Sequence, residues 1–127
     1  MKLARIRFCD EVDNRLRVLK ARTTLSANLL CRIGFGLSLA EPTTPNPEQY
    51  PENSTREIER GTLMGRYDAL FVALLRQRCL SDGIATDGDI FEEQFRAHMN
   101  RGVLLMYHQV KSLSDLCKLA SVEMPSG

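Results

Sequence analysis

The chain has 127 residues, a net charge of +1, and hydrophobic and charged fractions of 43% and 26%. These values are ordinary for one folded soluble domain, and the longest uncharged apolar stretch, residues 33–40, is far too short to span a bilayer. No apolar run follows the basic N-terminus as it does in a secretory signal, and the four cysteines form no C-x-x-C pair. We therefore expect a cytoplasmic protein with reduced thiols, and neither a membrane protein nor a disulfide-stabilised one.

The charges are distributed unevenly along the chain. Residues 1–40 hold eight basic and three acidic side chains, whereas residues 41–127 hold nine basic and thirteen acidic ones. This polarity suggests one surface that faces phosphate and one that keeps the protein soluble. A solvated helix face explains Arg15, Arg17 and Lys20 about as well.

Residues 3–8 alternate charged and apolar side chains, which predicts a β-strand with its arginines on one side and Ile6 and Phe8 on the other. Apolar residues then recur at helical spacing, which predicts two helices, over residues 10–22 and 27–39. A single strand cannot bury both of its faces against two helices, so we expect it to pair with the same strand of a second copy. Such a two-stranded ribbon backed by helices is a known reader of DNA.

Local signals place the ends of these two helices. Asp10 is the expected N-cap of the first helix, and Ser26 that of the second. Gly34 and Gly36 lie inside the second helix, where each costs about 1 kcal/mol relative to alanine. We expect Gly34 to serve close packing against a neighbouring helix rather than to break its own.

A proline-rich stretch over residues 41–55 has no apolar periodicity and predicts an extended surface connection. The remainder, residues 56–127, predicts helices over 67–80 and 89–111, followed by a short terminal helix. The expected fold is therefore mainly α-helical: a short N-terminal strand and two helices of the ribbon-helix-helix type, then a bundle of two to three further helices. The whole chain forms a single domain, in which residues 1–40 face DNA.

Residues typical of catalytic or metal sites are present, but their spacing supports no site. His98 and His108 lie on one predicted helix with no second ligand in reach, so we expect both to be polar surface or boundary residues. Cys31 is expected to be a small core residue rather than a reactive thiol. A nuclease with a metal ion bound by carboxylates stays open as an alternative, although the spacing of the acids does not favour it. The four candidate acids are Asp82, Asp87, Asp89 and Glu92. We expect no catalytic residue, no metal and no cofactor.

The basic residues of the N-terminal part are the expected phosphate contacts. Arg5 and Arg7 point from one face of the strand, and arginine can fork to guanine edges or clamp phosphates. Charges on an edge strand also serve simply to prevent aggregation. The full set of expected DNA contacts is Lys2, Arg5, Arg7, Arg15, Arg17, Lys20, Arg22 and Arg32. The expected oligomer interface comprises Ile6, Phe8 and Gly34.

Several runs of residues are similar to a known family. They include residues 2–7 and 37–42 in the N-terminal part, and residues 67–75 and 92–102 in the helical part. On these runs the chain resembles DndE, the small protein of DNA phosphorothioation systems, over nearly its whole length. The resemblance of residues 1–40 to ribbon-helix-helix proteins is more general.

The resemblance to DndE implies a role in replacing a non-bridging oxygen of the DNA backbone phosphate with sulfur. It implies a non-catalytic protein that forms a tetramer and favours nicked duplex through basic surface residues. The partners that it implies are double-stranded DNA, a cysteine desulfurase, an iron–sulfur sulfur transferase that uses ATP, and an ATPase. The leading expectation is therefore a DNA-binding accessory subunit without its own active site. The alternatives are a ribbon-helix-helix transcriptional repressor or antitoxin, and a metal-dependent DNA nickase.

Overall fold

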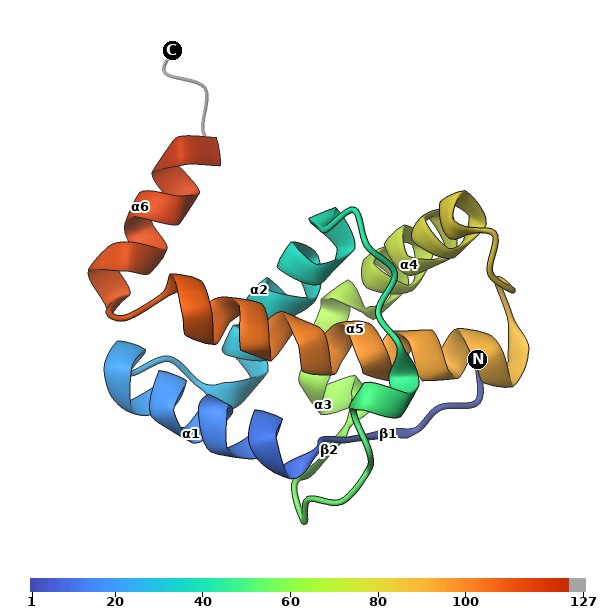
Figure 1. The fold of residues 1–127 in the computed structure, drawn as a ribbon, viewed down its shortest axis with the longest axis horizontal. Helices are drawn as coiled ribbons and strands as arrows, with labels where there is room; N and C mark the ends of the chain where they lie inside the picture. The colour runs from blue at the N-terminus through green and yellow to red at the C-terminus, as the bar shows by residue number, and fades with distance from the viewer. Residues whose placement is uncertain (124–127) are drawn as a thin grey trace.

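The computed structural model describes residues 1–123, which form six α-helices, two short 3-10 helices and two short strands (Figure 1). In chain order the elements are β1 (Arg5–Arg7), α1 (Asp10–Thr23), α2 (Ala27–Ala40), η1 (Pro47–Gln49), β2 (Glu57–Glu59), α3 (Arg60–Met64), η2 (Gly65–Tyr67), α4 (Asp68–Asp82), α5 (Gly88–Gln109) and α6 (Leu113–Glu123). This mainly helical fold, which opens with one short strand and two helices, confirms the expected fold class. None of the helices within residues 1–123 is long and apolar enough to cross a bilayer.

The longest helix, α5, runs across the middle of the molecule (Figure 1). It packs most extensively against α2 and next against α1. Phe91, Phe95, Met99 and Met106 have no exposed surface, as their helical spacing predicts. The ring of Phe95 lies 5.1 Å from that of Phe35 in α2, centroid to centroid. The buried face of α5 is therefore the centre of the hydrophobic core.

The backbones of α2 and α5 approach each other closely at a pair of glycines. A Cβ atom on Gly34 would lie 2.7 Å from the carbonyl carbon of Gly102, which is closer than real Cβ contacts come. A Cβ atom on Gly36, by contrast, would meet nothing within 4 Å. The packing role expected of Gly34 is confirmed. Its neighbour is a helix of the same chain, however, so its placement in an interface between copies is wrong.

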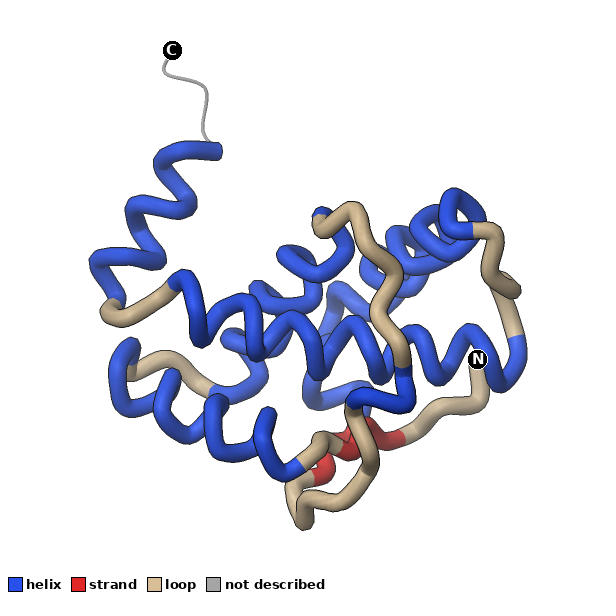
Figure 2. The backbone as a smooth tube through the Cα atoms, viewed as in Figure 1, coloured by secondary structure: helices blue, strands red, loops and turns tan. Residues whose placement is uncertain are grey.

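The strand β1 pairs with β2 of the same chain, in antiparallel orientation (Figure 2). The register places Arg5 opposite Glu59, Ile6 opposite Ile58 and Arg7 opposite Glu57. The expected pairing between two copies is therefore wrong, and with it the basis for a ribbon-helix-helix repressor. The partner strand has only three residues and directly precedes α3, so its alternation was too short to distinguish from a helix start.

Ile6 and Phe8 are buried by their own chain. Both have no exposed surface, and both belong to the core to which α1, α2 and α5 contribute. Their expected role in an oligomer interface is therefore wrong as well, because neither side chain has surface left for a second copy to cover. Burial of these residues instead stabilises the single chain by about 1.5–3 kcal/mol each.

The proline-rich stretch before β2 lies on the surface as expected, and arginines of the helices hold it there. Arg78 of α4 donates to the carbonyl oxygens of Glu41 and Thr43. Arg101 of α5 donates to the carbonyl oxygen of Thr43 at 2.7 Å. Carbonyl oxygens outside regular secondary structure need such donors when they are withdrawn from water. These two guanidiniums therefore have a structural role.

His98 is a buried core residue, so its expected position at the surface or boundary is wrong. Its side chain has no exposed surface, and its Nδ1 lies 2.8 Å from the hydroxyl oxygen of Ser38 in α2. The same hydroxyl oxygen accepts a hydrogen bond from Arg101 Nε at 2.8 Å. Burial, assisted by the positive charge of Arg101, lowers the pKa of His98 to about 3. The imidazole is therefore neutral at pH 7, whereas His108 is exposed as expected.

The helix starts differ slightly from the expected ones. Cys9 rather than Asp10 occupies the N-cap position of α1. Helix α5 begins at Gly88, one residue before the expected start, and Asp87 caps it by accepting from the backbone N–H of Gly88 at 2.9 Å. Ser26 caps α2 as expected. Sequence signals locate such ends only to within one or two residues.

Candidate nucleic-acid interface

The two arginines of β1 are paired with a carboxylate of β2. Arg7 donates to Glu57 at 2.8 Å and Arg5 donates to it at 3.4 Å, although their side chains are 45% and 68% exposed. The hydrogen bond from Arg7 lowers the pKa of Glu57, and the same hydrogen bond raises the pKa of Arg7. Both groups therefore stay charged at neutral pH. The ribbon formed by β1 and β2 carries two arginines and two glutamates, so its charge is balanced locally.

Arg17 of α1 is likewise paired with an acid. It donates to Asp13, one helical turn earlier, at 3.2 Å. Asp13 also accepts from Arg56 at 2.5 Å and from the hydroxyl of Ser54 at 2.8 Å. Burial on its own raises the pKa of Asp13, but the hydrogen bonds from Arg56 and Ser54 outweigh it, and the pKa lies below its usual value. Asp13 thus joins α1 to the segment before β2 and neutralises part of the charge of Arg17.

Lys2 and Arg32, two further expected contacts, also face groups of their own chain. Lys2 lines a recess together with Asp87 and Asp89 at the start of α5, where negative charge repels phosphate. Arg32 donates to the carbonyl oxygen of Leu63 at the end of α3, at 2.6 Å. Neither side chain lies in surroundings that favour an approaching phosphate group.

Three cations gather around the ring of Tyr107 near the end of α5. The guanidinium carbons of Arg15 and Arg22 lie 4.4 Å and 4.8 Å from the ring centroid, and Lys111 Nζ lies 5.0 Å from it. Arg15 and Arg22 are seven residues apart on α1, so they share one side of that helix. The negative face of an aromatic ring attracts cations that otherwise repel one another. We call Arg15, Arg22, Tyr107 and Lys111 the Tyr107 cluster.

The cations of the Tyr107 cluster have no carboxylate partner. Among the side chains that the structure describes, no acid lies within ion-pair distance of Arg15, Arg22 or Lys111. Lys111 is exposed and both arginines are partly buried. Arg22 Nη1 has no exposed surface and no hydrogen-bond partner in the part of the chain that the structure describes. The cluster therefore combines concentrated positive charge with a donor that is not in use, and oxygens of an anion complement both properties.

The structure thus divides the eight expected contacts. Arg15 and Arg22 come together in the Tyr107 cluster, and Lys20 is exposed at the end of α1 without an ion-pair partner among the described residues. The sequence reasoning missed Tyr107 and Lys111. Their spacing of four residues at the end of a predicted helix was a weak signal for a shared face, but no local pattern connects them to α1.

The four acids considered as ligands of a nuclease metal ion do not form a metal site. Asp82 pairs with Arg78 at 2.9 Å, and Asp87 caps α5. Among the side chains that the structure describes, those of residues 1–119, no group of three or more His, Cys, Asp or Glu is placed to hold a metal ion. Cys31 is buried, as expected, and burial raises the pKa of its thiol to about 12. A thiol of this kind stays protonated and unreactive.

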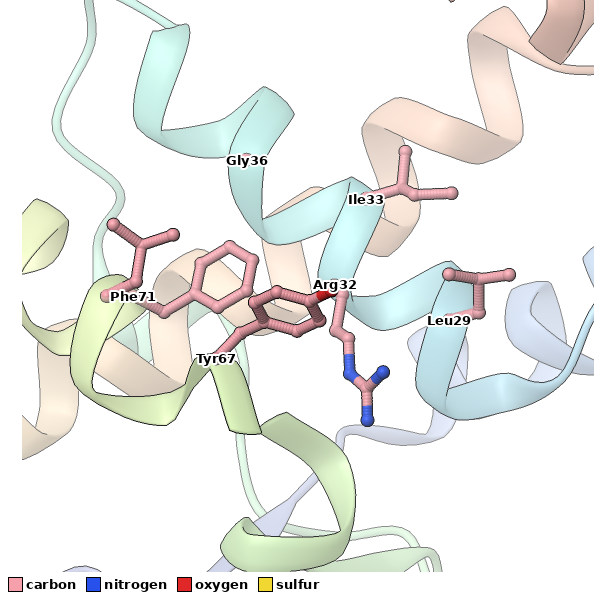
Figure 3. Close-up of a pocket in the computed structure, with 7 residues that line it drawn as sticks. Leu29, Arg32, Ile33, Gly36, Tyr67 and Phe71 are labelled. Carbon is pink, nitrogen blue, oxygen red and sulfur yellow. The ribbon is translucent and has the colours of Figure 1, made fainter. Parts of the chain in front are cut away.

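A second surface feature is an apolar groove between α2 and α4, which Figure 3 shows in close-up. Its volume is about 350 Å³, and Tyr67 at the end of η2 and Phe71 of α4 project into it toward α2. Leu29 and Leu70, which also line it, are 40% and 55% exposed. We call it the α2–α4 groove. Exposed apolar side chains that cluster in this way are typical of a surface that another molecule covers.

Comparison with known proteins places the chain among proteins of DNA modification. The family model described as "DNA sulphur modification protein DndE" matches residues 5–114. The fold is similar to the crystal structure of DndE from Escherichia coli B7A involved in DNA phosphorothioation modification, with a TM-score of 0.67 and 17% identity over 84% of this chain and 98% of that one. A DndE mutant with two glycines replaced by lysine aligns with a TM-score of 0.65 and 17% identity, over 84% of this chain and 99% of that one. The search of curated proteins gave no match.

Proposed function

Since this chain belongs to the DndE family of DNA sulphur modification proteins, we propose that it serves DNA phosphorothioation as a DNA-binding accessory subunit without an active site of its own. The protein binds the backbone of double-stranded DNA, nicked duplex in preference to intact duplex. It works beside the cysteine desulfurase, the iron–sulfur sulfur transferase and the ATPase that the family resemblance implies.

One observation carries the DNA-binding part of this proposal: the cations of the Tyr107 cluster are not neutralised. Oxygens of the DNA backbone attract arginine and lysine wherever no carboxylate of the protein competes. No described side chain forms an ion pair with Arg15, Arg22 or Lys111, although Asp115 accepts from the backbone N–H of Lys111 at 2.9 Å. Exposed Lys20 extends the same end of α1. We therefore assign phosphate contact to these four residues, in place of the β1 arginines.

We also propose that copies of this chain associate with one another. The contact between copies is made at the α2–α4 groove and not at the β1–β2 ribbon. Leu70, which lines the groove, and Leu74, one turn further along α4, are 55% and 46% exposed. An exposed apolar surface of this kind can be covered by the same surface of a second copy across a two-fold axis. Leu74→Glu is expected to lower the molar mass measured by light scattering, whereas Lys118→Glu, on exposed α6, leaves it unchanged.

The DNA-binding proposal is tested by fluorescence anisotropy with labelled nicked and intact duplexes of identical sequence. Four phosphate contacts predict that log affinity falls with log salt at a slope of roughly −3 to −4. The variant Arg15→Gln, Arg22→Gln, Lys111→Gln is expected to lose most of the affinity.

The matched control removes the same number of charges from paired positions, as Arg5→Gln, Arg7→Gln, Arg17→Gln. It is expected to retain most of the affinity, because these three guanidiniums already have carboxylate partners. Equal losses in the two triple variants would mean that net charge, and not the Tyr107 cluster, governs binding. A slope near zero would overturn the proposal itself.

A further inference from the structure

The Tyr107 cluster contains a buried hydrogen-bond donor for which the described residues supply no acceptor. Arg22 Nη1 has no exposed surface, and no acceptor among the described residues satisfies it. A buried donor without an acceptor is unfavourable, so a ligand that supplies an oxygen there gains from its position.

The charge of the cluster also restricts its ligand. Two guanidiniums and one ammonium lie within 5.0 Å of one ring centroid, and no described acid lies at ion-pair distance. An internal phosphodiester carries one negative charge and is esterified on two sides. A phosphate monoester carries about −1.5 to −2 at pH 7 and offers three free oxygens. Three cations therefore match a monoester better than a diester.

From this charge and this recessed donor we infer that the Tyr107 cluster binds the terminal phosphate monoester of a DNA strand, as found at an end or a nick. This inference rests on the proposed DNA binding and specifies which phosphate the cluster contacts. Arg22 donates to the oxygen that enters deepest, Arg15 donates from the adjacent side, and Lys111 supplies an exposed charge at the rim. The ring of Tyr107 keeps the cations together when no ligand is bound.

The test uses the full chain and one nicked duplex sequence in four forms: with a 5′-phosphate at the nick, with a 3′-phosphate, with hydroxyls only, and without a nick. A phosphorylated nick is expected to bind about tenfold more tightly than the hydroxyl nick, since it adds charge-assisted hydrogen bonds. The two phosphorylated forms show which strand end supplies the monoester. Preference for either one supports the inference.

Arg22→Gln is expected to abolish the preference for the phosphorylated nick, and Arg17→Gln, on the same helix but paired with Asp13, to retain it. Circular dichroism shows whether Arg22→Gln stays folded. Lys111→Gln, at an exposed position, provides a second variant that reduces the preference without disturbing the core.

Equal affinity for phosphorylated and hydroxyl nicks, with salt-dependent DNA binding intact, would overturn this inference and leave the proposed function standing. An absence of binding to all four duplexes would overturn both. A preference that survives in Arg22→Gln and in Lys111→Gln would also overturn the assignment, because the monoester would then bind elsewhere.

Discussion

The β1–β2 ribbon and the Tyr107 cluster both display arginines at the surface, but they differ in what holds the positive charge. In the ribbon, Arg5 and Arg7 share Glu57, whose carboxylate lies within 3.4 Å of both. In the Tyr107 cluster, Arg15 and Arg22 lie against an aromatic ring. A carboxylate cancels the charge that attracts phosphate, whereas an aromatic ring positions the cation and leaves its net charge in place. Counting arginines in a region therefore does not identify a DNA-binding surface.

The largest effect is expected from a substitution that disturbs the close contact between α2 and α5, at the centre of the fold. Gly34→Ala places a methyl group 2.7 Å from the backbone of Gly102 and is expected to destabilise the fold by about 3 kcal/mol through overpacking. Urea denaturation measures the loss. Gly36→Ala is the matched control in the same helix and is expected to stabilise the protein by up to about 1 kcal/mol, because nothing lies within 4 Å of the added methyl group. A Gly34→Ala variant as stable as the wild type would contradict the close contact.

The next largest effect is expected at Asp13, whose hydrogen bonds join α1 to the segment before β2. Asp13→Asn leaves Arg56 without its carboxylate at a buried position and is expected to lower the free energy of unfolding by about 2 kcal/mol. The pKa of Asp13 is lowered in the folded state, so its contribution is present above its unfolded pKa of 3.8 and is lost as the pH falls through the folded value. Acid denaturation of wild type and Asp13→Asn should therefore differ in pH dependence below pH 3.8. Parallel curves there would show that Asp13 is not the group responsible.

A smaller effect, on DNA binding and not on stability, is expected when one cation is removed from either region. Lys111→Gln is expected to weaken DNA binding equally for all base sequences and to reduce the magnitude of the salt slope by about 1. Arg5→Gln, which removes a cation already paired with Glu57, should change the slope by much less. Anisotropy titrations at several salt concentrations compare the two, and a larger change for Arg5→Gln would reverse our assignment of the regions.

The smallest effect is expected from removing the neutralising charge. Glu57→Gln leaves Arg5 and Arg7 without their carboxylate partner, so affinity for DNA should rise a few-fold, by about the effect of one additional phosphate contact. Stability should change little because the ion pairs are exposed. Unchanged affinity in this variant would show that the ribbon faces away from bound DNA, even when its charge is free.

Features that depend on near neighbours were predictable. The apolar spacing of Phe91, Phe95 and Met99 predicted the buried face of α5, and Ser26 marked the start of α2, because both signals lie within a few turns of one helix. The resemblance to DndE, drawn from runs of residues along the chain, agrees with the family match over residues 5–114. The packing role of Gly34 was also predictable, although the identity of its neighbour was not.

Features that depend on distant partners were not predictable from the chain. The partner of β1 lies about fifty residues away, beyond a proline-rich stretch, and three alternating residues are too few to mark a strand. The sequence predicts a surface or boundary position for His98 because the hydroxyl of Ser38, which satisfies it in the core, comes from another helix. Tyr107 and Lys111 were overlooked for the same reason, since α1 supplies the arginines beside them.

Local periodicity and capping residues specify where the helices of this protein begin, end and bury their apolar faces, because those forces act between residues close in the chain. Whether a surface arginine remains free for phosphate depends on the nearest carboxylate in space, and packing of α1 against α5 and of β1 against β2 sets that distance. Coulomb interactions fall with separation in space and are indifferent to separation in sequence. For this reason the eight basic residues of the first forty look alike in the sequence, and the folded chain gives them different roles.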